Sequence, residues 1–518
     1  MSAAAAPKIA SVRLLVGLET HVQLATRTKM FTRVASPACP EFEDAEPNTL
    51  IDPVTLGLPG ALPVMNKAAI EMAVRVGLAL GCSIAERTKW DRKSYFYPDL
   101  PKAYQISQYD MPLCFDGAVD LPLVDDAGEI TTKRVGIIRA HLEEDAGKLL
   151  HEAPGGGAID FSIVDYNRAG APLLEIVTQP DFHSADEVVA FAQALRQICR
   201  HLGVTEGVMQ KGHMRFEPNI NCHLTLEDGH TVKTPIVEIK NLNSFRALRD
   251  SIAFELEDQP KRWLADGKVM GPGAKTTRGW DDARQRTFVQ REKEDAHDYR
   301  YFPDPDLIPV EVDKSWRERL GATVPELPHT RYLRLRHDYN LSHKESAALC
   351  DEPPVARMFD DCVEAMAARD IDRAAAGKHA ANMLLQYGLK RANDAGVLVS
   401  DLGVTPDQIA QIVRLRIDDK IGSSAADELF GLLCDSDDDA EIAAARANLL
   451  QVTDTGALEG WCDQVLADPV NAKVVDDVQG GKTAAVGRLV GGVMKASGGA
   501  ADAKAVRAML LEKLGVSE

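Results

Sequence analysis

The strand-forming character of this sequence stops near Pro325 and Pro328, and that change constrains the fold more than any other feature. Up to about Val310, short β-favouring runs alternate with Gly, Pro, Asp and Asn, as is typical of a sheet. Beyond the two prolines, helical blocks are joined by Pro, Asp and Gly breakers. Because 518 residues exceed what one core normally supports, we expect two to four domains. The predicted class is α+β, with a large sheet domain followed by helices.

Four segments of the first part have the composition of strands, and two have the periodicity of helices. The predicted strands are 12–18, 135–138, 159–164 and 173–177. The predicted helices are 67–80, which has an apolar face, and 184–202, which opens with the N-cap pattern Ser-Ala-Asp-Glu. In the second part we predict helices over 344–350, 355–369 and 373–389.

Charge and cysteine content exclude several classes of protein. The net charge of -19 argues against a general nucleic-acid coat, although a local basic patch can still contact phosphates. The nine cysteines form no C-x-x-C pair, so neither a zinc ribbon nor a disulfide scaffold is indicated. The N-terminus lacks the apolar core of a signal peptide, and no run approaches the roughly 18 apolar residues of a membrane span. We expect a soluble, cytoplasmic protein with no membrane partner.

The last forty residues reverse the overall charge. From Gln479 to Glu518 there are six Lys or Arg residues and three acids, a local balance of +3. With its Gly-Gly-Lys at 480–482, this tail could present amides and cations to phosphates, although solvated helix faces would look similar. The acidic run 436–441 is interpreted as the start of a helix, where carboxylates favour the N-terminal dipole.

Four ionisable residues crowd into five positions at His141, Glu143, Glu144 and Asp145, and a Gly and a Lys follow them. Adjacent carboxylates repel one another, so this cluster indicates a hard cation surrounded by anionic oxygens. An acidic strand end on the surface is the alternative that these residues alone leave open.

Further carboxylates raise the weight of the metal hypothesis. Strand alternation puts Glu19 and His21 on one face, although a structural His/Glu pair would look the same. Glu175 and Glu238 interrupt apolar runs, and Glu217 follows Arg215 by two positions. A charge inside a buried strand is costly unless it is paired. Carboxylates with one His and no Cys favour Mg²⁺, Mn²⁺ or Ca²⁺, and carboxylates with Lys or Arg and Mg²⁺ are typical of phosphoryl transfer. The sequence has no G-x-x-x-x-G-K-[ST] loop, so any ATP must be held by another scaffold.

Two segments mix cations with phenols and prolines. They are 91–105 and 291–303, the first containing Lys93 between Arg92 and Tyr95. Such a mixture could stack on a base while its cations hold a phosphate or carboxylate; a rigid surface loop is the alternative.

These motifs together resemble the B-subunit family of bacterial aspartyl/glutamyl-tRNA amidotransferases, and the resemblance extends over nearly the whole chain. The segments that carry it are 17–21, 91–108, 141–148, 165–178, 238–245, 277–280 and 291–307, with 491–495 in the tail. The resemblance implies a glutamine-synthetase-like cradle domain over 1–315, a helical domain over 316–450 and a helical tail domain over 451–518 that contacts tRNA.

The resemblance also implies an activity. A glutaminase A subunit of amidase type and a small C subunit would complete a heterotrimer that acts on misacylated tRNA. ATP would phosphorylate the side-chain carboxylate of Glu-tRNA(Gln) or Asp-tRNA(Asn), and channelled ammonia would displace the phosphate.

Site roles follow from the same resemblance. His21, Glu144 and Glu175 would bind Mg²⁺, with Glu19, Glu143, Glu217 and Glu238 in or near its shell. Lys93 and Glu144 would line the ammonia outlet. Lys93, Glu144 and Glu143 are the expected catalytic residues, and the nucleotide is expected at Arg215 and Lys93.

Two departures from the family pattern matter. Many members have two cysteine pairs for zinc, at positions that are Thr32, Val34, Asp52 and Thr55 here. These side chains cannot build a thiolate site, so we predict no zinc and expect packing to hold the loop 31–56. The usual Arg-Cys-Asp is Arg-Phe-Glu at 215–217, which leaves the role of Glu217 open.

Two other functions remain to be tested. One is an amide ligase with its own glutaminase, but no nucleophile elbow or Gly/Ser-rich amidase segment is evident. The other is a non-catalytic scaffold that binds tRNA through its basic tail.

Overall fold

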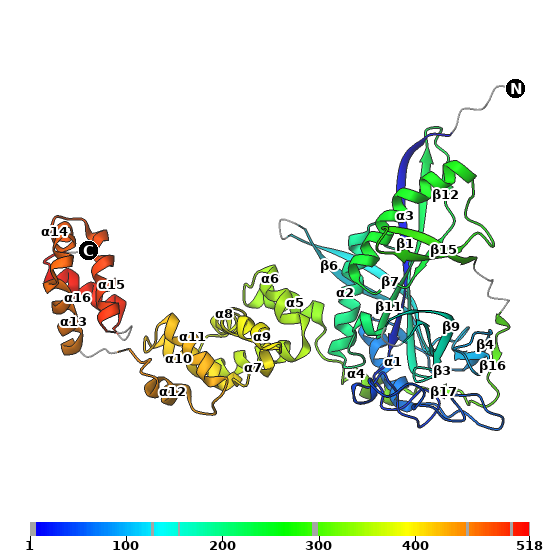
Figure 1. The fold of residues 1–518 in the computed structure, drawn as a ribbon, viewed down its shortest axis with the longest axis horizontal. Helices are drawn as coiled ribbons and strands as arrows, with labels where there is room; N and C mark the ends of the chain where they lie inside the picture. Colours follow the sequence, from blue (N-terminus) through cyan, green and yellow to red (C-terminus); the bar gives the residue numbers. More distant parts are fainter. Residues whose placement is uncertain are drawn as a thin grey trace. The chain divides into compact units, whose positions relative to one another are not determined.

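The computed structural model describes residues 7–125, 129–153, 156–292, 299–451, 455–497 and 501–516. The chain divides into two compact units, residues 1–330 and 331–518. The first contains a large sheet with helices, and the second is helical (Figure 1). The predicted succession of a sheet domain and helices is therefore confirmed. The finer boundaries at 315/316 and 450/451 remain predictions.

Thirteen strands of the described chain form the large sheet, ordered β15-β14-β13-β11-β1-β10-β7-β5-β4-β16 along its main path. The long central strands are β1 (Ile9–Gln23), β7 (Ile130–Glu144), β10 (Pro172–Thr178) and β11 (Met214–Leu226). The others are β2 (Ser83–Ile84), β4 (Asp91–Ser94), β5 (Tyr104–Ser107), β6 (Cys114–Val124), β12 (Thr231–Lys233), β13 (Val237–Lys240), β14 (Thr276–Asp281), β15 (Arg286–Glu292) and β16 (Phe302–Pro303). The pairs are antiparallel except β13 with β14.

Two short antiparallel pairs complete the strand inventory of the described residues. One pairs β3 (Arg87–Thr88) with β17 (Val310–Glu311), and the other pairs β8 (Lys148–Glu152) with β9 (Ala158–Asp165). The four predicted strands lie inside β1, β7, β9 and β10.

The sheet has an apolar face and a polar face because its strands alternate. Leu14, Val16 and Leu18 of β1 enter the core, whereas Glu19 and His21 point to the opposite face. The helices α1 (Lys67–Ala79), α2 (Ala185–His201) and α3 (Phe245–Asp266) contribute to the same core. All three begin at side-chain caps: Asn66 Oδ1 accepts from Ala68 N at 3.0 Å, Ser184 Oγ from Glu187 N at 3.2 Å, and Ser244 Oγ from Ala247 N at 3.0 Å.

After α4 (Lys314–Gly321), the chain continues through α5 (Pro328–Asp338) into the second unit. Its helices are α6 (His343–Asp351), α7 (Pro353–Ala367), α8 (Arg373–Asn382), α9 (Leu389–Ala395), α10 (Pro406–Ile417), α11 (Ser423–Leu433), α12 (Ala440–Arg446), α13 (Thr455–Ala467), α14 (Ala472–Gln479), α15 (Val486–Ala496) and α16 (Ala503–Lys513). A π-helical segment, Met383–Gly388, interrupts the helix predicted over 373–389. The last four helices build a core of their own around Leu489 and Leu510.

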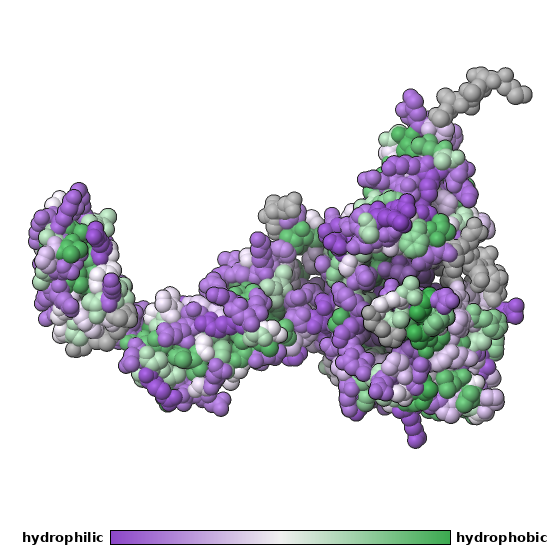
Figure 2. Space-filling view, viewed as in Figure 1, coloured by the Kyte–Doolittle hydropathy of each residue, from purple (hydrophilic) through white to green (hydrophobic). Residues whose placement is uncertain are grey.

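Hydrophilic residues cover most of the visible surface of the first unit (Figure 2). Among the described residues, no helix combines the length and the apolar character that crossing a membrane requires.

Candidate functional site

A cavity of about 650 Å³ lies on the polar face of the sheet, opposite the apolar core. Most of its charged lining comes from β1, β4, β7, β10, β11 and β13, and Asp99 and Asp145 add to it from loops. Several of these strands are far apart in the sequence but run side by side in the sheet (Figure 1).

Strand register explains how the cavity collects its side chains. His21 of β1 pairs with Glu175 of β10 on one side and with Arg215 of β11 on the other. Glu19, on the same face, pairs with Glu217. Directly paired residues bring their Cβ atoms within about 5 Å, so the register alone places these groups in contact.

A first cluster of possible metal ligands consists of His21, Glu143 and Glu175, which offer ligand atoms within 4.8 Å of one another. His21 Nε2 lies 3.4 Å from Glu175 Oε2. Burial would lower the pKa of His21, but the carboxylates of Glu217 and Glu175 raise it above its ordinary value. One imidazole and two carboxylates form a donor set that suits Mg²⁺ or Mn²⁺.

Three neighbours orient Glu143. It accepts hydrogen bonds from Ser107 Oγ at 2.9 Å and Gln105 Nε2 at 3.0 Å. His141 Nε2 lies 3.2 Å from Glu143 Oε1. Burial and Glu175 would raise the pKa of Glu143, but His141 and Lys93 keep it below the ordinary value. His141 therefore supports the cluster without belonging to it.

Lys93 brings a cation into the cavity beside this cluster. Its amine lies 5.0 Å from the ring centroid of Tyr299 and 5.7 Å from that of Tyr95. Burial would lower its pKa, but Glu143 and the neighbouring phenols raise it. The side chain is thus a protonated amine held between carboxylates and aromatic faces.

A second cluster consists of Glu19, Glu217 and Glu238, whose ligand atoms again lie within 4.8 Å of one another. Lys240 Nζ lies 2.6 Å from Glu217 Oε2 and 3.5 Å from Glu238 Oε1. Burial would lower the pKa of Lys240, but Glu217 and Glu238 hold it well above its usual range. Asn219 Nδ2 donates to Glu19 Oε1 at 2.9 Å.

Arg215 is held by an ion pair with Asp145. Its guanidinium donates to both carboxylate oxygens, at 3.0 and 3.2 Å, and Gln23 Nε2 adds a bond of 2.9 Å. Burial would raise the pKa of Asp145, but Arg215 and Arg168 hold it well below its usual range. The two parallel hydrogen bonds of this ion pair hold the guanidinium of Arg215 at the cavity wall, because Gln23 also holds Asp145 in place.

Glu144 does not join either cluster. It lies on the other side of β7, where it accepts from Ile106 N at 2.9 Å and pairs with Lys102. Both side chains of this pair are buried. Glu143, the adjacent residue, occupies the place beside His21 and Glu175 that was expected for Glu144.

Comparison with known proteins decides the family. Residues 14–318 match the family described as GatB/GatE catalytic domain, and residues 361–514 match the GatB domain. The chain is 41% identical over 502 residues to a protein of Rhodopirellula baltica, covering 97% of this chain and 96% of that one. It is 43% identical over 505 residues to a protein of Variovorax paradoxus, covering 97% and 99%. Each of these relatives is named as the B subunit of aspartyl/glutamyl-tRNA(Asn/Gln) amidotransferase. This chain belongs to that family.

Thr32, Val34, Asp52 and Thr55, the positions where the resemblance implies cysteines in many relatives, lie in a loop that hydrogen bonds help to hold together. Asp52 accepts from the hydroxyl of Thr32, and its Oδ1 accepts from Thr55 N at 2.8 Å. Lys29, fully buried nearby, donates to Leu50 O at 2.6 Å. The expectation that packing holds this loop thus needs a correction, because polar contacts contribute. The absence of zinc remains a prediction from side-chain chemistry.

The aromatic segment 91–105 borders the cavity. Tyr95 and Tyr97 line it together with Tyr299, and Tyr109 stacks on Tyr301 with ring centroids 4.1 Å apart. Residues 293–298 of the second aromatic segment lie outside the described residues.

Sequence reasoning missed several residues of the cavity. Lys240, Gln105 and Asn219 each contact a carboxylate of the two clusters, and Ser107 contacts Glu143. Lys240 stands two residues after Glu238, so alternation could have placed it on the same face. Gln105 and Ser107 carry no comparable signal, because only the pairing of β5 with β7 brings them to Glu143.

Proposed function

We propose that this chain is the component of a tRNA-dependent amidotransferase that activates and amidates the substrate. The side-chain carboxylate of Glu-tRNA(Gln) or Asp-tRNA(Asn) would attack the γ-phosphorus of ATP, and ADP would leave. Ammonia would then attack the acyl carbon, phosphate would leave, and the amide would form. The observation that carries this proposal is the pair of carboxylate clusters on one sheet face, with Lys93 and Lys240 beside them.

The residues present fit divalent cations. His21, Glu143 and Glu175 would hold one Mg²⁺, and Glu19, Glu217 and Glu238 offer a second all-oxygen position. Bound Mg²⁺ would neutralise phosphate oxygens and polarise the transferred phosphoryl group.

The chain's own cations would perform the remaining electrostatic work. Phosphorylating a carboxylate brings two anions together, so positive charge must stand near both. Lys240 and Arg215 would orient the nucleotide phosphates from β13 and β11. Lys93, a protonated amine beside Glu143, would orient the substrate carboxylate.

The proposal includes partners and a compartment. A glutaminase subunit of amidase type would supply ammonia, a small C subunit would tie it to this chain, and the complex would work in the cytoplasm. The Lys102–Glu144 pair behind β7 is our candidate for the ammonia outlet, together with Lys93. The cradle would resemble that of glutamine synthetase, and the basic tail with α15 and α16 would contact tRNA.

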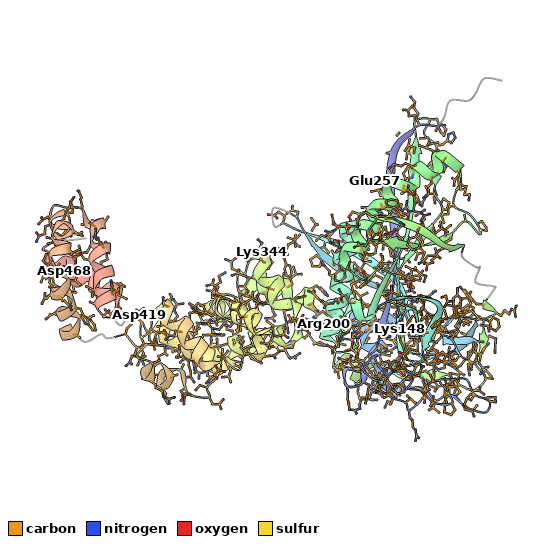
Figure 3. All side chains as sticks on the ribbon, in the orientation of Figure 1. Lys148, Arg200, Glu257, Lys344, Asp419 and Asp468 are labelled. Atoms are coloured by element: carbon orange, nitrogen blue, oxygen red, sulfur yellow. The ribbon has the colours of Figure 1, made fainter. Side chains whose placement is uncertain are left out.

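The test is ATP-dependent amidation by the complex purified with both partners, on each misacylated tRNA. Glu175→Gln should reduce amide formation by about 100-fold while glutamine hydrolysis and tRNA binding persist, because one metal ligand is lost. Glu257→Gln on α3, labelled in Figure 3, is the matched control, since that side chain is 79% exposed. Unchanged amidation by Glu175→Gln would favour the non-catalytic scaffold.

A built-in glutaminase is a weaker candidate. All nine cysteines are free thiols, and burial raises the pKa of Cys82 to about 11 and those of Cys199 and Cys222 to about 12. Such thiols are poor nucleophiles at neutral pH. Amidation by the isolated chain with glutamine as the nitrogen source would establish this alternative.

A further inference from the structure

Glu255 on α3 is a fully buried carboxylate that the proposed reaction does not use. Its Oε1 accepts from Thr287 Oγ1 of β15 at 2.6 Å, and Arg278 Nε of β14 lies 3.5 Å from the same oxygen. Its Oε2 accepts from Gln259 Nε2 at 3.0 Å and from Arg262, both on the same helix. A charge this deeply buried is costly unless it is paired, and these four groups supply the pairing.

The hydrogen bonds around Glu255 extend into three strands of the large sheet. Arg278 Nε donates to Thr287 Oγ1 at 2.8 Å, and Arg278 Nη2 donates to Thr287 O at 3.2 Å. Gln259 Nε2 also donates to Ile220 O of β11 at 3.1 Å. Polar contacts therefore join α3 to β11, β14 and β15 at the end of the sheet that β15 closes.

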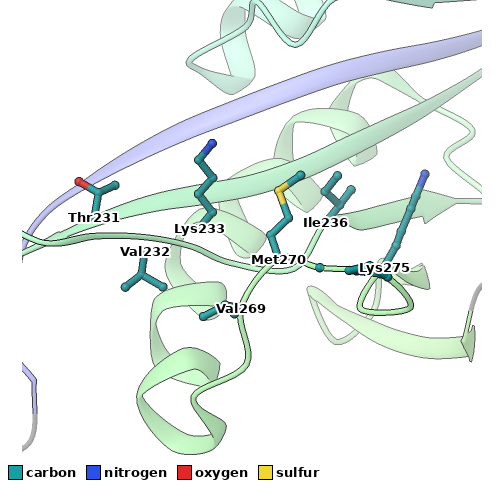
Figure 4. Close-up of a pocket in the computed structure, with 9 residues that line it drawn as sticks. Thr231, Val232, Lys233, Ile236, Val269, Met270 and Lys275 are labelled. Atoms are coloured by element: carbon teal, nitrogen blue, oxygen red, sulfur yellow. The ribbon is translucent and has the colours of Figure 1, made fainter.

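The opposite face of β14 contacts the second carboxylate cluster. Side chains alternate along a strand, so Arg278 faces α3 whereas Thr277 faces the cavity. Thr277 pairs with Glu238 of β13, and its Oγ1 donates to Glu238 Oε2 at 3.4 Å. Lys275, which lines a neighbouring hollow just before β14 begins (Figure 4), places its amine 3.6 Å from the same oxygen. Glu238 thus depends on β14 for two of its contacts.

A β-bulge lies where the two faces of β14 meet the network and the cavity. The register of β14 with β15 shifts by one residue between Thr277 and Arg278, which makes Gln290 the extra residue of the bulge. Gln290 lines the cavity. A bulge disrupts the ladder of hydrogen bonds and re-aims side chains, so the shape of the hairpin here depends on other contacts. The network around Glu255 supplies such contacts directly behind the bulge.

We propose that Glu255 is a positioning residue for the cation of the second carboxylate cluster, because it holds β14 where Glu238 needs it. This inference rests on the proposed function, which places a cation among Glu19, Glu217 and Glu238. The neighbours of a metal ligand fix its orientation, and their loss weakens metal binding by about 10- to 100-fold. Glu255 acts one step further away, through β14, so we expect an effect near the lower value. A role in stability alone is the alternative, since a buried ion pair also affects folding.

Thr287→Val in the complete complex tests the inference, because it removes the hydroxyl that joins Arg278 to Glu255. Titration with Mn²⁺, followed by electron paramagnetic resonance, should resolve two ions in the wild-type cavity. Coupling to the imidazole nitrogen of His21 identifies the ion of the first cluster, and the ion of the second cluster lacks that coupling. The variant should raise the dissociation constant of the second ion about 10-fold and leave that of the first unchanged. Thr287→Ser keeps the hydroxyl and should bind both ions as the wild type does.

Leu248→Ala on α3 is the matched control for stability. Leu248 is fully buried in the apolar core, so its truncation should lower the Tm while both dissociation constants stay the same. Glu255→Gln should weaken the second ion at least as much as Thr287→Val, because a neutral amide cannot balance the guanidinium groups of Arg262 and Arg278.

Three results would reduce Glu255 to a stabilising residue and overturn the inference. They are an unchanged second ion in Thr287→Val, equal weakening by Thr287→Val and Thr287→Ser, and the same weakening by Leu248→Ala. A wild-type complex that binds no ion without nitrogen coupling would overturn the inference together with the second cation of the proposed function. A wild-type complex that binds both ions but makes no amide with ATP would instead refute the proposed function, and the Mn²⁺ titrations would still decide the role of Glu255.

Discussion

Glu143 and Glu144 are neighbours on β7 with opposite surroundings, so replacing each with Gln should separate cation binding from folding. Glu143 faces the cavity beside His21 and Glu175. Glu144 faces the protein interior, where it is paired with Lys102.

The cost of Glu143→Gln should appear in cation affinity. At about 4 Å and an effective dielectric constant of about 20, two unit charges interact by about 4 kcal/mol. A water molecule that takes the place of the lost carboxylate at the ion recovers part of that energy. We therefore expect the dissociation constant for Mg²⁺ to rise about 100-fold, which corresponds to about 2.7 kcal/mol. The amide oxygen of the Gln can still accept from Gln105 Nε2, and its NH₂ group can donate to Ser107 Oγ, so stability should change little.

The cost of Glu144→Gln should appear in stability. Its partner Lys102 has a side chain only 8% exposed, and removing one member of a buried ion pair costs about 3 kcal/mol or more. An unfolding entropy of about 2.1 cal/mol/K per residue gives about 0.7 kcal/mol/K for the 330-residue unit, hence a fall of about 4 °C in Tm.

Two measurements on the complete chain decide between these effects: titration calorimetry with Mg²⁺ and thermal unfolding by circular dichroism. Loss of Mg²⁺ affinity in Glu144→Gln together with full affinity in Glu143→Gln would refute the assignment of Glu143 to the cation cluster. Equal loss of affinity in both variants would also contradict the opposite orientations.

Three further substitutions test other parts of the fold. Burial lowers the pKa of Lys29 to about 8, against 10.5 in the unfolded chain. Between these two pH values the unfolded chain binds a proton that the folded chain has lost, so the free energy of unfolding should rise by about 3 kcal/mol from pH 8 to 10.5. Denaturant curves of Lys29→Met should lack that rise. Asp52→Ala removes the acceptor for Thr32 and Thr55 and should lower the unfolding free energy by about 2 kcal/mol, with an unchanged Tm as the contrary result. Gly377→Ala places a Cβ 2.2 Å from the Tyr339 ring and should destabilise the helical unit by about 1–3 kcal/mol in urea, whereas Gly487→Ala, in open space, should not.

Local patterns predicted much of the fold. The β-favouring composition of 12–18 and 173–177 identified parts of β1 and β10, and apolar periodicity identified α1 and α2 to within a residue at their ends. These elements depend mainly on interactions between near neighbours in the chain. The interruption of the helix over 373–389 was not predictable in this way, because its π-helical turn packs in a tertiary environment where Leu384 is fully buried.

For the site, the sequence by itself determined which residues carry the chemistry, since a His and many carboxylates at strand positions indicate a hard cation wherever the strands lie. Tertiary structure decided which of them meet. Alternation separates Glu143 from Glu144 but does not say which face of β7 holds the cavity. The antiparallel pairing of His141 with Glu175, and of Glu175 with His21, decides that, because directly paired residues share a face. The partnership of Lys240 with Glu217 likewise arises from strands brought together by folding.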